Sequence, residues 1–234
     1  MRLDSYIFLK KYCDSRNKAQ ELIKSKKVLV DGKIVTKPSF QITSQNVCIK
    51  KSNQYVSRAG KKLKNFLSSY HIDIKNRVCL DIGSSSGGFI EVLLEFGAKE
   101  VIGVDVGKNQ LHPKIKSSPK VVSYEECDIR NFKSEKYFHV VTCDLSFISL
   151  EHVLRDIDRL ASFDIVILFK PQFEVGKDVK RDKRGVVKQK ESIELALSKF
   201  EISCREFSWQ LLQKTESFPK GKEGNLEIFY HFRK

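Results

Sequence analysis

The amino-acid sequence is organised around VCLDIGSSSGGF, residues 78–89. A short apolar run ends in Asp81, a loop of small residues follows, and an amphipathic run begins, which predicts a strand, a tight turn and a helix start. Gly83, Gly87 and Gly88 allow the backbone to approach a ligand closely. The free N–H groups of a helix start suit a negatively charged group. An ordinary turn of an α/β protein is the alternative that the segment alone leaves open.

Two further acidic residues follow apolar runs in the same way. Asp105 closes the run 101–104 and lies 24 residues beyond Asp81, a spacing that suits a carboxylate bound to both hydroxyls of a ribose. Asp128 follows the run 121–124, where a carboxylate can accept a hydrogen bond from an adenine amine. Three strand-end acids in this order predict a cofactor that contains adenosine.

The loop differs from the dinucleotide-binding fingerprint, because Ser85 stands where that fingerprint has its middle glycine. It resembles instead the loop of S-adenosylmethionine-dependent methyltransferases, which binds a carboxylate and a sulfonium rather than a pyrophosphate. The resemblance implies S-adenosylmethionine as the cofactor. The residues that we expect to bind it belong to the loop and to the strand ends: Asp81, Gly83, Ser84, Ser85, Gly87, Gly88, Phe89, Asp105, Asp128, Ile129 and Asp144.

The composition narrows the class of protein. The 234 residues carry a formal net charge of +14 and are 41% hydrophobic, which allows a substantial core and favours a polyanionic partner such as RNA. Charged residues interrupt the apolar pieces of the N-terminus and no stretch is long enough for a membrane helix, so we expect neither a signal peptide nor a membrane partner. The six cysteines show no C-x-x-C pair and no matching histidine spacing. This favours free thiols in the cytoplasm and no metal site. The oligomeric state stays open.

Residues 1–50 are predicted to form a small α+β unit. Two helical segments, the second capped by Ser15, precede a hairpin signal around Asp31 and Gly32. Residues 1–51 include 12 basic and 4 acidic residues, a net charge of +8 that favours a phosphate-binding surface over a solvated helix face. This order of elements, with RLD at 2–4, resembles the small RNA-binding module first described in a small-subunit ribosomal protein. Expected RNA-binding residues are Arg2, Arg16, Lys18, Lys24, Lys27 and, beyond the module, Arg58.

The polar residues 51–55 predict a linker, and residues 56–234 a second domain. Its strand 164–169 is almost continuously apolar, as expected in the middle of a parallel sheet, and it ends at Lys170. Strands alternate with helices until two last β-rich runs. We therefore predict an α/β, Rossmann-like sheet of about seven mostly parallel strands, preceded by the small α+β module.

Five motifs resemble the TlyA (haemolysin A) family over essentially the whole chain. They are VSRAGKKL at 56–63, LDIG at 80–83 with GGF at 87–89, DLSFISL at 144–150, KPQFE at 170–174 and GNLE at 224–227. The catalytic domain of that family is similar to the FtsJ-type ribose 2′-O-methyltransferases. The resemblance implies a Lys-Asp-Lys-Glu tetrad, which falls on Lys62, Asp144, Lys170 and Glu227. It also implies rRNA, free or in a ribosomal subunit, as the substrate.

Family members methylate a cytidine of large-subunit rRNA, and some also methylate one in small-subunit rRNA. This chain starts directly at Arg2-Leu3-Asp4 and stops soon after its last strand, so we expect it to act on the large subunit alone.

The chemistry suits these residue types independently of the resemblance. A ribose hydroxyl is a poor nucleophile and needs a nearby proton acceptor. Lys170 ends a central strand, where ligands bind in open α/β sheets, and is our candidate for the general base. Lys62 lies beside the apolar stripe of a predicted helix, where an exposed lysine is the ordinary expectation. Asp144 and Glu227 are expected to orient the two amines.

Four other functions compete with this interpretation of the sequence. Residues 83–87 match the G-x-S-x-G nucleophile elbow of hydrolases, but that elbow follows a long α/β portion, and here a basic module precedes it. A base methyltransferase is disfavoured, because the sequence has neither the Asn/Asp-Pro-Pro-aromatic motif nor the Pro-Cys nucleophile that are usual in that class. A pore-forming cytolysin, which the family name suggests, is disfavoured because the sequence predicts no strongly amphipathic basic helix. A non-catalytic RNA-binding or ribosome-assembly factor stays open, and methyl transfer to RNA distinguishes it from the enzyme.

Overall fold

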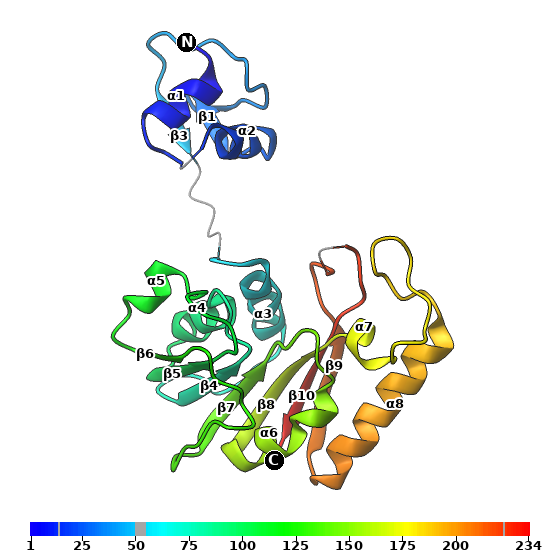
Figure 1. The fold of residues 1–234 in the computed structure, drawn as a ribbon. Helices are drawn as coiled ribbons and strands as arrows, with labels where there is room; N and C mark the ends of the chain where they lie inside the picture. The colour runs from blue at the N-terminus through cyan, green and yellow to red at the C-terminus, as the bar shows by residue number, and fades with distance from the viewer. Residues whose placement is uncertain (14, 50–54, 222) are drawn as a thin grey trace. The chain divides into compact units, whose positions relative to one another are not determined.

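The computed structural model describes residues 1–13, 15–49, 55–221 and 223–234, which form two compact units, 1–54 and 55–234 (Figure 1). Each unit has a hydrophobic core of its own. The predicted linker 51–55 lies outside the described residues except for Tyr55.

Two short helices and a three-stranded sheet make up the first unit. These are α1 (Leu3–Leu9), α2 (Arg16–Lys24), β1 (Val28–Val30), β2 (Lys33–Ile34) and β3 (Val47–Ile49), with strand order β2-β1-β3 and antiparallel pairs. The Ser15 side chain accepts a hydrogen bond from the backbone N–H of Lys18, which confirms the predicted cap of α2. Asp31 and Gly32 have positive φ angles of 49° and 79°, as the predicted hairpin turn requires.

The second unit is built on a seven-stranded sheet in the order β6-β5-β4-β7-β8-β10-β9. The strands are β4 (Val78–Ile82), β5 (Glu100–Val104), β6 (Val121–Tyr124), β7 (Phe138–Cys143), β8 (Ala161–Phe169), β9 (Gln210–Glu216) and β10 (Ile228–Arg233). The strands β4 to β8 are parallel, whereas β10 lies antiparallel between β8 and β9. The predicted α/β class and the number of strands are confirmed.

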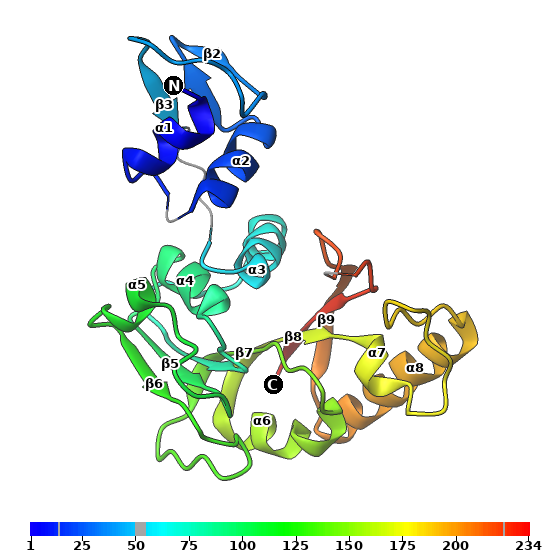
Figure 2. The same cartoon turned by 45° about the horizontal axis from the view of Figure 1, so that its top comes forward.

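Helices cover both faces of this sheet (Figure 2). They are α3 (Arg58–Ser69), α4 (Gly88–Glu95), α5 (Pro113–Lys116), the short 3-10 helix η1 (Leu150–His152), α6 (Leu154–Leu160), α7 (Pro171–Glu174) and α8 (Lys190–Glu206). Apolar side chains of α3 and α4 pack on one face, and those of α6 and α8 pack on the other. Because side chains alternate along a strand, the buried strands are apolar on both faces. No helix in the described part of the chain is long and apolar enough to cross a membrane.

Candidate active site and RNA-binding surface

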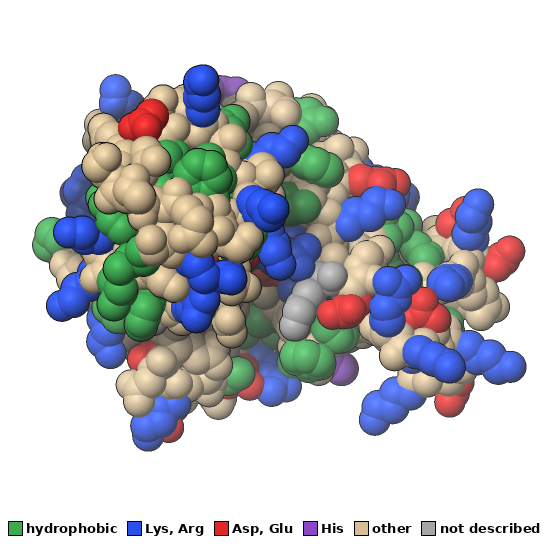
Figure 3. Space-filling view, turned by 90° about the horizontal axis from the view of Figure 1, so that it is seen from above, with side chains coloured by type: hydrophobic (Ala, Val, Ile, Leu, Met, Phe, Trp, Pro, Cys, Tyr) green, Lys and Arg blue, Asp and Glu red, His purple; other side chains and the backbone are tan. Residues whose placement is uncertain are grey.

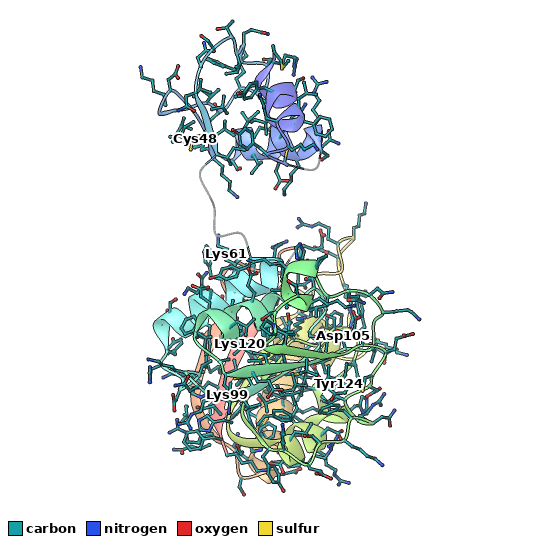
Figure 4. All side chains as sticks on the ribbon, turned by 90° about the vertical axis from the view of Figure 1, so that its left-hand side faces the viewer. Cys48, Lys61, Lys99, Asp105, Lys120 and Tyr124 are labelled. Atoms are coloured by element: carbon teal, nitrogen blue, oxygen red, sulfur yellow. The ribbon has the colours of Figure 1, made fainter. Side chains whose placement is uncertain are left out.

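The carboxyl edge of the sheet gathers most of the predicted site residues. Gly83, Asp105, Asp144 and Lys170 directly follow β4, β5, β7 and β8, whose parallel direction brings these ends to one edge. Figure 4 shows this polarity at the outer strands, with Asp105 and Tyr124 at one edge and Lys99 and Lys120 at the opposite edge. Glu227 reaches the same edge because β10 runs antiparallel and Ile228 pairs with Phe169, the residue before Lys170.

The predicted tetrad residues form two ion pairs in which every partner except the half-buried Asp144 is buried. The Lys170 Nζ lies 2.7 Å from Asp144 Oδ1 and donates to Ser146 Oγ at 2.8 Å. Lys62, on the inner side of α3, is ion-paired with Glu227. Lys62, Lys170 and Glu227 are between 5% and 8% exposed. The exposed position that the helical pattern favours for Lys62 is therefore wrong, because α3 turns that lysine towards the start of β10.

Glu174 joins the loop after β7 to the segment after β8. Its carboxylate accepts hydrogen bonds from Ser149 Oγ at 2.7 Å and from the backbone N–H of Leu150 at 3.1 Å. Burial raises the pKa of Glu174 above its ordinary value. The motifs at 144–150 and 170–174 are thus tied together at both ends, by Lys170 and by Glu174. The sequence shows both motifs, but neither predicts the contact of Glu174 with Ser149 and Leu150.

The glycines of the 83–88 loop are required by neighbouring protein segments. A Cβ on Gly83, whose φ is +80°, would lie 2.9 Å from the backbone oxygen of Asp144. A Cβ on Gly88 would collide with Ser57 Oγ at the start of α3 and would lie 2.9 Å from the backbone nitrogen of Gly60. The loop after β4 is therefore pressed between the loop after β7 and α3, a packing reason that the prediction of close ligand approach did not include.

Asp81 is a buried acid with one unsatisfied oxygen. Its Oδ1 accepts from Thr142 Oγ1 at 2.7 Å, whereas no hydrogen-bond partner for Oδ2 exists among the described residues. Burial raises the pKa of Asp81 well above its ordinary value, and only Thr142 opposes that shift appreciably. Asp81 lines a cavity of about 170 Å³ together with Ser84, Phe89, Asp144 and Lys170. The cavity thus joins the glycine loop to the lysine of one ion pair.

A second, larger cavity of about 380 Å³ lies beside the first. Asp105, Asp128 and Ile129 line it together with apolar side chains such as Leu145 and Val153. Both Asp105 oxygens accept from backbone N–H groups, those of Ser85 at 2.8 Å and Gly107 at 2.7 Å. The size and apolar walls of this larger cavity suit an adenosine, because such ligands bind in mostly apolar pockets with a few polar groups.

Asp128 is held by a neighbour that sequence reasoning missed. Its carboxylate accepts from Arg130 Nε at 3.0 Å, from Arg130 Nη2 at 2.6 Å and from the Arg130 backbone N–H at 2.9 Å. These hydrogen bonds, the side-chain ones first, hold the pKa of Asp128 below its ordinary value. An adenine amine bound by Asp128 would therefore share that carboxylate with Arg130.

The rim of the larger cavity carries an exposed aromatic side chain. Phe147 is 91% exposed, has a φ of +66°, and its ring centroid lies 5.0 Å from that of Phe173 in α7. A bulky residue with positive φ is uncommon and is held only where the surrounding loop imposes it. The DLSFISL motif contained this residue, but nothing in its spacing distinguished it from a core phenylalanine.

The predicted RNA-binding residues fall on both units. Arg2 and Arg16 lie side by side around the buried Asp4 in the first unit. Lys18 pairs with Glu21 on the surface, and Lys24 and Lys27 are exposed or partly exposed near the end of α2. Arg58 belongs to the second unit and donates to the backbone oxygen of Lys220 at 3.0 Å. Lys and Arg predominate over Asp and Glu on the face shown in Figure 3.

Comparisons with known proteins agree with this geometry. The family described as FtsJ-like methyltransferase matches residues 55–234, and the S4 domain matches residues 1–48. A Campylobacter jejuni protein named 23S rRNA (cytidine-2′-O)-methyltransferase TlyA is 45% identical, and the match covers 100% of both chains. A Mycobacterium tuberculosis protein named 16S/23S rRNA (cytidine-2′-O)-methyltransferase TlyA is 36% identical over 99% of this chain and 89% of its own length.

Solved structures give the same picture. A hemolysin-named protein from Streptococcus thermophilus is 29% identical, with a TM-score of 0.73, and the match covers 100% of this chain and 88% of that one. An S-adenosylmethionine-dependent methyltransferase from Mesorhizobium loti shares the fold at 13% identity, with a TM-score of 0.55 over 73% of this chain and 96% of that one. The sheet order, the glycine loop between two strand-end acids and these matches lead to one conclusion: the chain belongs to the TlyA family, with an FtsJ-like methyltransferase domain and an S4 domain.

Proposed function

We propose that the protein methylates the 2′-hydroxyl of a cytidine in large-subunit rRNA, with S-adenosylmethionine as methyl donor. The relatives named above as rRNA (cytidine-2′-O)-methyltransferases support the reaction and the class of substrate. The relative named for 23S rRNA alone is 45% identical and the one named for both rRNAs is 36% identical, which favours the large subunit. An rRNA substrate in turn implies that the protein is located in the cytoplasm.

The domain roles follow from the same comparison. We assign residues 1–50 to RNA binding, 51–55 to a linker and 56–234 to methyl transfer. The S4 match at 1–48, the methyltransferase match at 55–234 and the division into two compact units support these bounds.

The cofactor fits the two neighbouring cavities. The larger one would hold the adenosine, with Asp105 at the ribose and Ile129 against the ring, and the smaller one would hold the amino-acid part. The unsatisfied Asp81 Oδ2 is the observation that carries this fit, because a buried carboxylate oxygen without a donor suits an ammonium group. When bound there, S-adenosylmethionine supplies an electrophilic methyl group.

Lys170 is placed to take the proton of the attacking hydroxyl. It is buried at the end of a central strand, lines the smaller cavity and is positioned by Asp144 and Ser146. An amine can accept a proton only in its neutral form, so this role requires Lys170 to have given up its own proton before the hydroxyl attacks. Lys62 and Glu227 would orient the ribose from the start of β10, as a second buried pair. In-line placement of the hydroxyl and the methyl group then contributes about 7–11 kcal/mol at most, the range seen for well-oriented reactants.

RNA rather than a small molecule fits the outer part of the site. Phe147 offers an exposed ring at the cavity rim, and unstacked RNA bases bind to such rings. A 2′-hydroxyl as acceptor also restricts the reaction to RNA.

The proposal is tested with the purified full-length chain, radiolabelled S-adenosylmethionine and the two rRNAs, each prepared from cells that lack this activity. We expect label in large-subunit rRNA only, at a nucleotide that resists alkaline hydrolysis and is released as 2′-O-methylcytidine. Label on a base would contradict ribose methylation, and equal label in small-subunit rRNA would contradict the subunit preference. RNA binding without any label would identify the non-catalytic alternative.

A further inference from the structure

The first unit contains a buried carboxylate that methyl transfer does not need. Asp4, in the first turn of α1, has 0% exposure. Its two oxygens accept from Arg2 Nε and Nη2, each at 3.0 Å, from Arg16 Nε at 3.2 Å and Nη2 at 3.5 Å, and from Gln20 Nε2 at 2.9 Å. The backbone N–H of Ser5 donates to it at 2.9 Å. The hydrogen bond from Arg2 is the main reason that the pKa of Asp4 lies far below its ordinary value.

This arrangement fixes two guanidinium groups and leaves part of each open. Arg2 and Arg16 both face Asp4 with the same edge, Nε and Nη2. A guanidinium carries five N–H donors, and among the residues that the structure describes none accepts from the outer edge of either arginine, Nη1 and the second N–H of Nη2. That outer edge is the one that can bind two phosphate oxygens side by side. The side chains are 44% and 50% exposed, so solvent and ligands reach them.

We propose that Asp4 is a positioning residue that holds Arg2 and Arg16 as one rigid guanidinium pair for phosphates of the RNA backbone. The inference rests on the proposed RNA binding by the first unit and adds the reason for its geometry. Two guanidinium charges share one carboxylate, so the trio keeps a net charge of +1 and still attracts a phosphate.

The two arginine side chains are held rigidly by Asp4, which lowers the entropic cost of RNA binding. A free arginine loses side-chain freedom when it binds, at a cost of about 0.5–1.5 kcal/mol for each immobilised side chain. Here Asp4 fixes both side chains before RNA arrives. Lys18 shows the contrast, because it pairs with Glu21 and both side chains are exposed, at 44% and 62%.

Asp4→Asn tests the inference, because two explanations of RNA binding predict opposite signs. If charge alone drives binding, removal of an acid strengthens it. If Asp4 positions the arginines, the substitution weakens binding roughly tenfold, the loss equivalent to one charge-assisted hydrogen bond. Binding of the full-length chain to large-subunit rRNA is measured over a series of salt concentrations. Asp31→Asn is the matched control, because Asp31 is exposed, its side chain accepts from the backbone N–H of Asn46, and it lies in the same unit.

A second variant keeps the inference falsifiable if Asp4→Asn fails to fold. Arg2→Lys combined with Arg16→Lys preserves both charges but removes the planar guanidinium edges. We expect roughly tenfold weaker binding, a rise in KM for rRNA without change in kcat, and an unchanged salt slope. In this double-lysine background Asp4→Asn should cost no further affinity, because it acts through the arginines. Wild-type affinity in the double-lysine variant, or tighter binding in a folded Asp4→Asn variant, would overturn the inference.

Charge reversal separates this inference from the proposal on which it rests. Arg2→Glu combined with Arg16→Glu should weaken rRNA binding strongly if the first unit binds RNA at all. Unchanged affinity there would refute both statements together. Weak binding after charge reversal with normal binding of the double-lysine variant would refute only the positioning role.

Discussion

Two buried aspartates, one in each unit, differ in how far their hydrogen-bonding capacity is filled. Asp4 accepts from two arginines, a glutamine and a backbone N–H, and its pKa lies far below its ordinary value. Among the described residues Asp81 accepts only from Thr142, and burial raises the pKa of Asp81. The filled carboxylate of Asp4 holds neighbouring side chains in place, whereas the unfilled oxygen of Asp81 is where we propose that a ligand binds.

The largest expected effect is at the lysine that shares its cavity with Asp81. Lys170→Ala should bind cofactor yet lose about 10²- to 10⁴-fold in single-turnover methylation, the usual contribution of a general base. Lys170→Arg should be equally slow, because a guanidinium does not deprotonate at working pH. Near wild-type turnover in the arginine variant would reduce Lys170 to an electrostatic role and move the base elsewhere. Lys188→Arg, at an exposed site, serves as control.

The next effect is on cofactor affinity at the unfilled carboxylate. Asp81→Asn should weaken S-adenosylmethionine binding by about 1.5–3 kcal/mol, the usual contribution of a charged hydrogen bond, as measured by calorimetry. The pKa of Asp81 is raised, so wild-type affinity should climb with pH as this carboxyl ionises and then level off. The asparagine variant should lack that climb. An equal pH dependence in both proteins would show that another group binds the ammonium.

A smaller effect distinguishes the two aspartates by sign. The raised folded pKa of Asp81 means that the unfolded chain ionises first, so stability falls as pH rises above 3.8, the ordinary value. Asp81→Asn should therefore raise the unfolding midpoint of the cofactor-free protein at neutral pH.

The lowered pKa of Asp4 gives stability that is present above pH 3.8 and lost as the pH falls through the pKa of the folded state. Asp4→Asn should lower the free energy of unfolding of the first unit by about 1–3 kcal/mol, and its unfolding midpoint should fall accordingly. Calorimetric scans at pH 7 measure the unfolding midpoints of both variants. Midpoints that shift in the same direction would contradict the difference between the two aspartates.

The smallest effect is expected at an exposed cation. Lys18→Ala should reduce the slope of log affinity for RNA against log salt by about 0.7–0.9 at most, the value for one phosphate contact. Because Lys18 already pairs with Glu21, the loss of affinity should be smaller than for Arg16→Ala. A larger loss at Lys18 would show that exposed charge contributes more than fixed geometry.

Local rules predicted the edge of the sheet but not the contacts across it. An apolar run that ends in a polar residue is visible in sequence, and it correctly brought Asp105, Asp144 and Lys170 to one edge. Glu174 on Ser149 and Ser57 against Gly88 have no local pattern, because each depends on how segments pack in three dimensions. Arg130 on Asp128 is a contact between residues two positions apart, which the search for strand-end acids did not include. The burial of Lys62 was missed for the same reason. The catalytic and binding roles of these residues stay predictions until variants are measured.

The position of β10 has a consequence for biosynthesis. This strand, made after β8 and β9, lies between them and carries Glu227 at its start. Until residues 228–233 have emerged, β8 has a long apolar edge without its partner, and unpaired edges invite wrong pairing. The first unit, by contrast, has a sheet and a hydrophobic core of its own and can fold early in translation. With the roles that we propose for the two units, a nascent chain would hold RNA before it could modify it.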